Sequence, residues 1–162
     1  MTHQATPRDR KPEAGLRIRR SRRTDFVAVM RLLAASGVPV PAPDRATLRR
    51  FRRVVDDLGA DFYLILVDGT LAGLVHVTYA RQVAGAPRAR LDQLVVAEPF
   101  RRRGIGAALL AFAQTRARRR GCGTLCCWRA PDHDAADLFL ERAGLRAMGT
   151  WFVQELQAGN RD

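Results

Sequence analysis

The hydrophobic pattern of the first half of the chain predicts one short strand and two helices. Residues 16–19 alternate apolar and basic side chains, which is the period of a half-buried strand. A helix follows, with Thr24 at its N-cap position, and its apolar face comprises Phe26, Val29, Met30 and Leu33. Prolines within residues 36–43 interrupt it, and a second helix is predicted between the cap Asp44 and the stop Gly59. The apolar face of the second helix comprises Leu48, Phe51, Val55 and Leu58.

The second half of the chain predicts a β meander that continues into a strand–helix–strand unit. The dipeptide Asp68-Gly69 joins the apolar runs 62–67 and 71–79 and is a strong hairpin signal. A strand at 88–96 follows, then a helix at 104–120 that Gly121 ends. The residues of this helix expected to face inward are Ile105, Leu109 and Phe112. A further strand, a helix and a short final strand complete an α+β fold with a mixed sheet.

One loop carries most of the chemical information. The sequence Arg101-Arg102-Arg103-Gly104-Ile105-Gly106 stands between the strand at 88–96 and the apolar start of a helix. Unpaired N–H groups at a helix N-terminus attract anions, glycines let the backbone approach a phosphate, and arginines add charge. The loop is therefore predicted to cradle phosphate groups. It is not a Walker loop, because the only lysine is Lys11, and a dinucleotide fingerprint would need a small residue at Leu109.

The Arg-x-x-Gly-x-Gly motif after a strand resembles the pyrophosphate loop of the GNAT superfamily of acetyl-CoA-dependent N-acetyltransferases. Residues 121–128 resemble the fifth strand of that family, and residues 136–145 resemble its last helix and the glycine turn after it. The resemblance implies one GNAT domain over residues 15–158, with a twisted, mostly antiparallel sheet flanked by helices and a β-α-β cofactor unit. Residues 1–14 are polar and basic and are expected to form a disordered tail.

The resemblance also implies where acetyl-CoA binds. In this family the fourth and fifth strands splay apart, main-chain groups of the fourth strand bind the pantetheine arm, and one N–H can stabilise the oxyanion. The cofactor-binding residues expected on this basis are Leu94, Val95, Val96, Arg101, Arg102, Arg103, Gly104, Ile105, Gly106, Ala107 and His133. His133 stands where the family often has an asparagine, and it could instead cap the last helix.

A base is needed because an ammonium ion has no free lone pair with which to attack a thioester. A carboxylate, acting directly or through water, commonly removes the proton. Asp92 is the leading candidate, since it interrupts an apolar strand a few residues before the cradle. The alternative is a structural role, with Asp92 solvated or paired to Arg90 or Arg129. Glu98, further along the loop, is the weaker candidate.

Two features of the resemblance bear on the acid and the acceptor. The tyrosine that often protonates the leaving thiolate is replaced by Leu140, so the thiolate would leave unaided, take a proton from water or use another donor such as Tyr79. The family's acceptor specificity generally comes from the connection between the first two helices and from a C-terminal hairpin. Here the former, residues 36–43, is proline-rich and stiff, and little chain remains for the latter. A relatively open acceptor site is expected.

Composition limits the other partners. The chain has 28 basic and 16 acidic residues, a net charge of +12, and all but one of the basic residues are arginines spread along its length. This favours weak non-specific nucleic-acid binding over a specific nucleic-acid site. A cluster of arginines suits the C-terminus of the helix at 104–120, namely Arg116, Arg118, Arg119 and Arg120.

The remaining features point to a reduced, cytoplasmic protein. The three cysteines are predicted to be buried and form neither a disulfide framework nor a zinc pattern, so no metal is expected. No stretch approaches the roughly 18–20 apolar residues of a membrane span, and no secretory signal is recognised. A homodimer is left open.

Two functions are consistent with these patterns. The first is an acyltransferase that moves an acetyl group from acetyl-CoA to a primary amine of a small molecule or peptide, by direct attack in a ternary complex. The second is a degenerate GNAT domain that binds acetyl-CoA or CoA as a sensor or interaction module without efficient turnover. The cradle supports both, and Leu140 slightly favours the second.

Overall fold

The computed structural model of the chain describes residues 15–128 and 134–149. The chain divides into two compact units, residues 1–129 and 130–162, which are treated separately. The tail predicted at residues 1–14 lies outside the described residues, as do His133, Arg129 and the chain after residue 149, where a final strand was expected. The single domain at 15–158 stays a prediction.

The first unit contains a five-stranded sheet in the order β1-β2-β3-β4-β5. All neighbouring strands are antiparallel except β4 and β5, which are parallel. The elements are β1 (Leu16–Arg20), η1 (Arg23–Asp25), α1 (Phe26–Ala35), α2 (Arg45–Asp56), β2 (Asp61–Val67), β3 (Thr70–Ala80), β4 (Arg88–Val96), η2 (Glu98–Phe100), α3 (Ile105–Arg119) and β5 (Thr124–Cys127). The predicted α+β class and mostly antiparallel sheet are confirmed.

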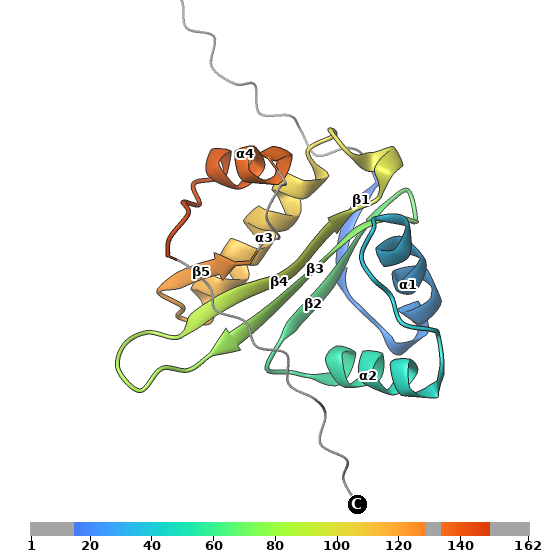
Figure 1. Cartoon of the computed structure of the whole chain (residues 1–162), viewed down its shortest axis with the longest axis horizontal. Helices are drawn as coiled ribbons and strands as arrows, with labels where there is room; N and C mark the ends of the chain where they lie inside the picture. The colour runs from blue at the N-terminus through green and yellow to red at the C-terminus, as the bar shows by residue number, and fades with distance from the viewer. Residues whose placement is uncertain (1–14, 129–133, 150–162) are drawn as a thin grey trace, which may run out of the picture. The chain divides into compact units, whose positions relative to one another are not determined.

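Helices cover both faces of the sheet, as Figure 1 shows. On one face α1 and α2 pack against β2 and β3, and this core includes Val29, Leu33, Phe51, Val55, Phe62, Leu64 and Leu74. On the other face α3 packs against β3 and β4. The inward side of α3 contains Ile105, Leu109, Leu110, Ala113 and Ala117, all buried. Phe112, also predicted inward, is half-buried and contacts the Tyr63 ring with 4.7 Å between centroids.

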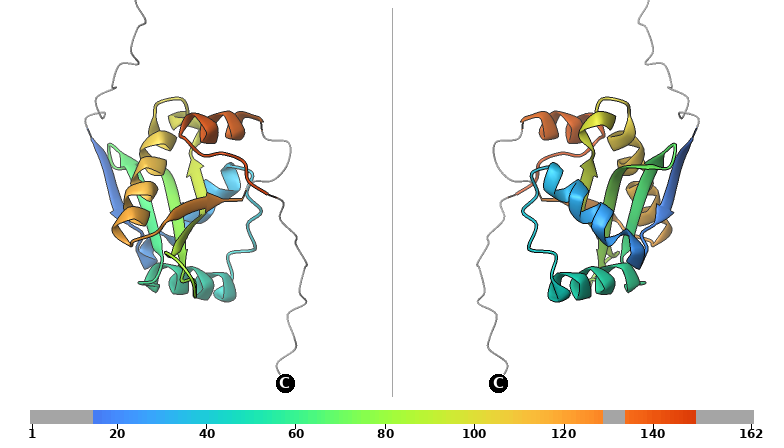
Figure 2. Two further views of the ribbon diagram at one scale, coloured as in Figure 1. Left: turned by 90° about the vertical axis from the view of Figure 1, so that its left-hand side faces the viewer. Right: turned by 90° about the vertical axis from the view of Figure 1, so that its right-hand side faces the viewer.

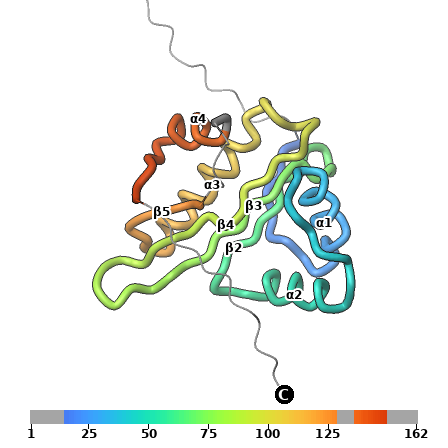
Figure 3. The backbone as a smooth tube through the Cα atoms, viewed as in Figure 1, coloured from blue at the N-terminus to red at the C-terminus, as the bar shows by residue number. Residues whose placement is uncertain are grey.

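The hairpin between β2 and β3 forms as predicted. Asp68 and Gly69 both have positive φ, +49° and +80°, the geometry of the type I′ turn that matches strand twist. Further along β3, Gly73 lets the strands approach closely. A Cβ atom there would lie 2.6 Å from the main-chain oxygen of Val95 on β4. The connection from β3 to β4 extends beyond the rest of the sheet (Figure 3).

The predicted start of the first helix and the predicted end of the second helix are wrong. Thr24 lies in η1, and α1 begins only after Asp25, whose carboxylate accepts a 2.7 Å hydrogen bond from the N–H of Arg22. This short turn takes up the residues that Thr24 would have capped. Gly59 does not end α2, which stops at Asp56, and Leu58 is 81% exposed outside the helix. Asp44 is the N-cap of α2, as predicted, and accepts a 2.7 Å bond from the N–H of Thr47.

The second unit contains α4 (Asp134–Arg142). Gly144 follows it with φ +85°, and the N–H of Leu145 bonds the main-chain oxygen of Leu140 at 3.0 Å. This pattern is a left-handed glycine stop, so the predicted helix and its glycine turn are confirmed.

Candidate functional site

The pairing of β4 with β5 stops halfway along β4. Arg88 to Leu91 pair with Thr124 to Cys127, and β5 ends there. The left view of Figure 2 shows β5 in orange beside the sheet, and β5 has no residue opposite the second half of β4. Residues 92–96 therefore have β3 on one side and no strand partner on the other within the described part of the chain. The splay that the resemblance implies stays a prediction, because residues 129–133 lie outside the described part of the chain.

The free edge of β4 consists of half-buried residues. Leu94, Val95 and Val96 pair with β3 through Val75, Leu74 and Gly73, which fixes one edge of the strand. The opposite edge exposes main-chain groups in a largely apolar setting, a ready-made template for pairing with an extended ligand. The three residues that the sequence assigned to the pantetheine arm thus lie together on a segment that pairs with β3 on one edge and with no described strand on the other.

The loop after β4 presents the N-terminus of α3 to solvent. Gly104 is the N-cap, with φ +82°, and a Cβ atom built there would meet nothing within 4 Å. Because glycine has no side chain, no oxygen caps the helix, and the first helical bond in this stretch runs from Ala108 to Gly104. The N–H groups of Ile105, Gly106 and Ala107 donate to no acceptor among the described residues. Orphan donors together with the helix dipole are the features that an anion site requires.

Three exposed arginines surround these donors. Arg102 has φ +63°, a left-handed conformation that is uncommon for a non-glycine residue. Arg101 Nε donates a 3.2 Å bond to the main-chain oxygen of Val96, which ties the loop to the end of β4. The guanidinium of Arg103 lies 5.7 Å from the centre of the Phe100 ring. The residues of this loop fit a pyrophosphate, since they combine orphan N–H groups, open space over a glycine and unburied positive charge.

Asp92 lies where β4 leaves β5. His76 pairs with Gln93 and Val77 with Leu91, so Asp92 is an extra residue in β4 and forms a β-bulge. Its Oδ2 accepts a 2.6 Å bond from the hydroxyl of Thr78, and its Oδ1 pairs with Arg90. The pairing with Arg90 was the structural alternative for Asp92. Its side chain nevertheless keeps 21% of its exposure, so the carboxylate is still open to a ligand.

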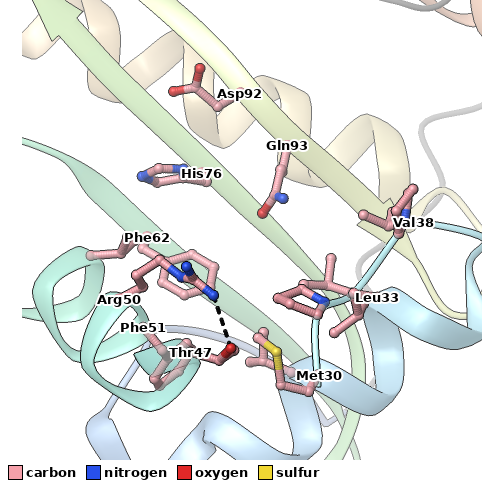
Figure 4. A pocket seen from close by; sticks show the side chains of 15 residues that line it. Met30, Leu33, Val38, Thr47, Arg50, Phe51, Phe62, His76, Asp92 and Gln93 are labelled. Carbon is pink, nitrogen blue, oxygen red and sulfur yellow. Dashed lines mark hydrogen bonds between the residues drawn. The ribbon is translucent and has the colours of Figure 1, made fainter. Parts of the chain in front are cut away.

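A pocket of about 330 Å³ lies between the sheet and the α1–α2 connection, with Asp92 in its wall (Figure 4). The connection contributes Val38, Pro39, Val40 and Pro41, so the proline-rich segment does border this space. The other lining residues are Val29, Met30, Leu33, Thr47, Arg50, Phe51, Val54, Phe62, His76 and Gln93.

His76 is a functional candidate that the sequence did not reveal. It projects from β3 into the pocket beside Asp92 and Gln93 (Figure 4). Its ring packs edge-on against Phe62 with 5.5 Å between centroids. Burial lowers the pKa of His76, and this outweighs the opposite effect of the nearby Asp92 charge. The only sequence signal was a histidine in an alternating strand.

A buried ion cluster on the opposite face of the sheet explains one arginine of α3, Arg116, and its C-cap residue, Arg120. Asp61 is 1% exposed and accepts bonds from Arg116 Nε at 2.8 Å and Arg120 Nη2 at 3.1 Å. Arg20 lies 3.7 Å away. Burial would raise the pKa of Asp61, but the hydrogen bonds from Arg116, Tyr79 and Arg120 together hold it at about 2. Arg116 and Arg120 therefore bind a buried carboxylate, a role additional to the predicted interaction with the dipole at the helix C-terminus.

Tyr79 belongs to the same cluster. Its hydroxyl donates a 2.6 Å hydrogen bond to Asp61, and the Arg120 guanidinium lies 4.4 Å from the centre of its ring. Burial and the bond to Asp61 raise the pKa of Tyr79. Because its proton is committed to a buried carboxylate, Tyr79 is unsuited to protonate a thiolate, and that suggestion is wrong.

The remaining residues that the sequence singled out lie at the following positions. Glu98 is exposed at the start of η2, Leu140 is half-buried in α4, and His133 lies outside the described residues. The cysteines are free and half-buried rather than buried. Among residues 15–128 and 134–149 no three His, Cys, Asp or Glu side chains are grouped to hold a metal ion. No helix in these ranges is long and apolar enough to cross a membrane.

Comparisons with known proteins agree with this geometry. The sequence model of the Acetyltransferase (GNAT) family matches residues 26–145. No curated protein sequence matches the chain. Among solved structures, a transcriptional regulator from Bacillus halodurans C-125 superposes with a TM-score of 0.79 and 21% identity, over 87% of this chain and 99% of that one.

Two further neighbours are named as acetyltransferases. Glucosamine-6-phosphate N-acetyltransferase from Arabidopsis thaliana has a TM-score of 0.75 and 15% identity, over 88% of this chain and 99% of that one. An aminoglycoside N-acetyltransferase in complex with CoA has a TM-score of 0.74 and 17% identity, over 88% and 95% of the two chains. At these identities the neighbours show a shared fold.

Proposed function

The chain belongs to the GNAT acetyltransferase family, and from that premise we propose that it transfers an acetyl group from acetyl-CoA to a primary amine. The observation that carries the proposal is the pairing of β4 with β5, which stops at Leu91 and leaves an unpaired strand edge next to an open helix N-terminus. An extended ligand with a pyrophosphate at one end fits these two features together.

The cofactor residues divide into two groups. Residues 94–96 provide main-chain donors and acceptors for the amides of an extended arm, and one of their N–H groups would stabilise the oxyanion. Residues 101–107 provide arginine charge and the orphan N–H groups of α3 for the phosphates. Acetyl-CoA supplies the acetyl group as an activated thioester.

Asp92 is the proposed base. A protonated acceptor gives one proton to the Asp92 carboxylate, and the resulting amine attacks the acetyl carbonyl directly. The bond from Thr78 holds one carboxylate oxygen, and Arg90 holds the other. These contacts fix the orientation of the carboxylate at the β-bulge. The proton then passes to solvent, to which the half-exposed pair of Asp92 and Arg90 is open.

At the sequence position where the family often has a tyrosine acid, this chain has Leu140, which cannot donate a proton to the departing thiolate. Tyr79 does not replace it, since its proton is bonded to Asp61. In the proposed reaction the C–S bond breaks without a protein acid; the new amide nitrogen gives its second proton to water, and the CoA thiolate takes a proton from water. The absence of this acid is also the observation that favours the second candidate function, a CoA-binding domain with little turnover.

One experiment separates these functions. Thermal melting with increasing acetyl-CoA measures binding, because a ligand of the native state raises the melting temperature. Thiol release with a panel of primary amines then measures transfer. A melting shift with amine-dependent thiol release supports the enzyme, whereas a shift without release for any amine supports the binding module. No shift at millimolar acetyl-CoA would contradict both. The cytoplasmic location and the possible homodimer remain predictions.

A further inference from the structure

The pocket beside Asp92 has a chemical character that limits what can enter it. Its wall is made by apolar side chains of α1, α2, β2 and the α1–α2 connection, and its polar groups are few. We propose that this pocket is the acceptor site and that it selects a small primary monoamine with an apolar body. The inference rests on the proposed function, since it names the acceptor class for that reaction.

The size of the pocket favours a small molecule. Its volume of about 330 Å³ lies at the lower end of the range of roughly 300–1,000 Å³ found for small-molecule sites. Met30 and Leu33 of α1, Phe51 of α2 and Phe62 of β2 surround it (Figure 4). Such a wall gains free energy by covering methylene groups or a ring, and it offers few partners to the hydroxyl groups of a sugar.

The polar end of the pocket fits one ammonium group. Among the described residues that line the pocket, Asp92 is the only carboxylate, and Arg90 already compensates part of its charge. His76 and Gln93 lie beside it and can accept or donate hydrogen bonds (Figure 4). Burial lowers the pKa of His76, so at neutral pH the ring adds no positive charge that would repel an ammonium ion. The described lining offers no second carboxylate, so it has a partner for one cation at most.

Arg50 places a positive charge on the α2 side of the same pocket. Its Nη2 atom donates a 3.0 Å bond to the Thr47 hydroxyl, and Figure 4 shows this pair apart from Asp92. A second ammonium held inside the pocket would lie near this guanidinium or against the apolar wall, and both positions are unfavourable. The pocket therefore disfavours diamines, polyamines and aminoglycosides.

The position of the polar end links the pocket to the cofactor edge. Asp92 is the bulge residue, and β4 has lost its β5 partner by this point. Asp92 and Gln93 therefore belong both to the pocket wall and to the start of the β4 segment that has no β5 partner. An amine whose apolar body fills the pocket would hold its nitrogen at the place where the proposed cofactor edge begins.

A matched pair of amines tests the inference. Hexylamine and 1,6-diaminohexane have the same chain length and differ in the second ammonium group. The chain, saturated with CoA, should bind hexylamine at least about tenfold more tightly than the diamine in titration calorimetry. With acetyl-CoA, kcat/KM should rise roughly threefold to fourfold for each methylene from propylamine to hexylamine. 2-Phenylethylamine should also be accepted, while spermidine, kanamycin and glucosamine 6-phosphate should be poor acceptors.

Three variants locate the effect in this pocket. Arg50→Glu should reduce the preference for hexylamine over the diamine to about threefold or less, because the repelling charge becomes an attracting one. Val40→Phe fills the pocket from the connection and should weaken hexylamine binding about tenfold or more. Val83→Phe is the matched control, since Val83 is fully exposed in the β3–β4 connection, and it should leave hexylamine binding unchanged.

The outcomes distinguish the inference from the proposed function. Efficient turnover of spermidine, kanamycin or glucosamine 6-phosphate in preference to hexylamine overturns the inference and leaves acetyl transfer intact. Tight hexylamine binding to the CoA complex without thiol release from any amine supports the pocket assignment and overturns the proposed transfer. Equal effects of Val40→Phe and Val83→Phe would show that the amine binds elsewhere.

Discussion

The hydroxyl of Thr78 donates a 2.6 Å hydrogen bond to Asp92, the residue that bulges from β4. The bond crosses from β3 to β4 and holds the Asp92 carboxylate at the point where β5 pairing has ended. Through this bond the sheet fixes a titratable group between an apolar pocket and an unpaired strand edge. The proposed reaction needs a base in that position.

Replacing Asp92 should affect chemistry more than cofactor binding. Asp92→Asn keeps the shape of the side chain and an oxygen that can accept from Thr78, but it removes the basic carboxylate. We expect turnover to fall roughly 10²- to 10⁴-fold, with the melting shift caused by acetyl-CoA nearly unchanged. Glu98→Gln is the comparison, and it should keep most of the activity. Full turnover by Asp92→Asn, or unfolding of the variant, would assign Asp92 a structural role with Arg90.

Two glycines of the same helix test the phosphate site. Gly104 and Gly121 flank α3, both have positive φ, and a Cβ atom at either would meet nothing within 4 Å. Gly104→Val and Gly121→Val should therefore strain the backbone in the same way and lower the melting temperature similarly. Only Gly104→Val should abolish the stabilisation by acetyl-CoA, because its side chain stands over the orphan N–H groups. Equal acetyl-CoA shifts in the two variants would place the pyrophosphate elsewhere.

The buried cluster around Asp61 predicts a specific loss of stability in acid. The pKa of Asp61 is about 2 in the folded chain and 3.8 as the ordinary value. The stabilising contribution is therefore complete above about pH 4 and is lost as the pH falls through about 2. It amounts to about 2 kcal/mol. Asp61→Asn leaves the arginines without their counter-charge and should lower the free energy of unfolding by about 3–5 kcal/mol.

Denaturant unfolding between pH 5 and pH 2 measures this contribution. Asp56→Asn is the control, because Asp56 pairs with Arg23 at the surface, where an ion pair contributes little. An acid transition that is unchanged in Asp61→Asn would show that another carboxylate controls it.

His76 should give the chain a second pH dependence, closer to neutrality. Burial lowers its pKa from the ordinary 6.5, so the unfolded chain takes up this proton first as the pH falls. The contribution of His76 to the free energy of unfolding should thus be fully present above pH 6.5. It should be lost as the pH falls through the lowered pKa of His76. His76→Gln should remove this part of the pH dependence of the melting temperature. A wild-type profile that is flat over this interval would mean that His76 titrates normally.

The sequence predicted those parts of the fold that are determined by residues close together in the chain, such as turns and helix caps. Asp68-Gly69 gives a hairpin because these residues tolerate positive φ, and Asp44 caps α2 because its side chain reaches an N–H three residues on. The errors at Thr24 and Gly59 arose where a 3₁₀ turn or an extended cap competed with the expected signal. Neither alternative has a strong signature in the sequence.

The loop and strand segment of the candidate site could be proposed from the sequence, but the side-chain arrangement around them could be proposed only in part. The glycines and arginines of residues 101–106 are contiguous, so the cradle could be recognised directly. Asp92 could be proposed because it interrupts an apolar strand, but the bulge that holds it depends on pairing with β3 and could not be predicted from the sequence. Arg50 lines the same pocket as Asp92 and Gln93, and Arg116 bonds Asp61. Both arrangements bring together residues far apart in the sequence, so no local pattern reveals them.

The most direct measurement of the central claim is mass spectrometry of the product formed from acetyl-CoA with an isotope-labelled acetyl group. The full chain, incubated with this cofactor and hexylamine, should yield N-hexylacetamide carrying the label, in an amount equal to the free CoA thiol released. Asp92→Asn should reduce both together. Release of thiol without labelled amide, or no release with any primary amine although acetyl-CoA raises the melting temperature, would contradict acetyl transfer to an amine as the function of this chain.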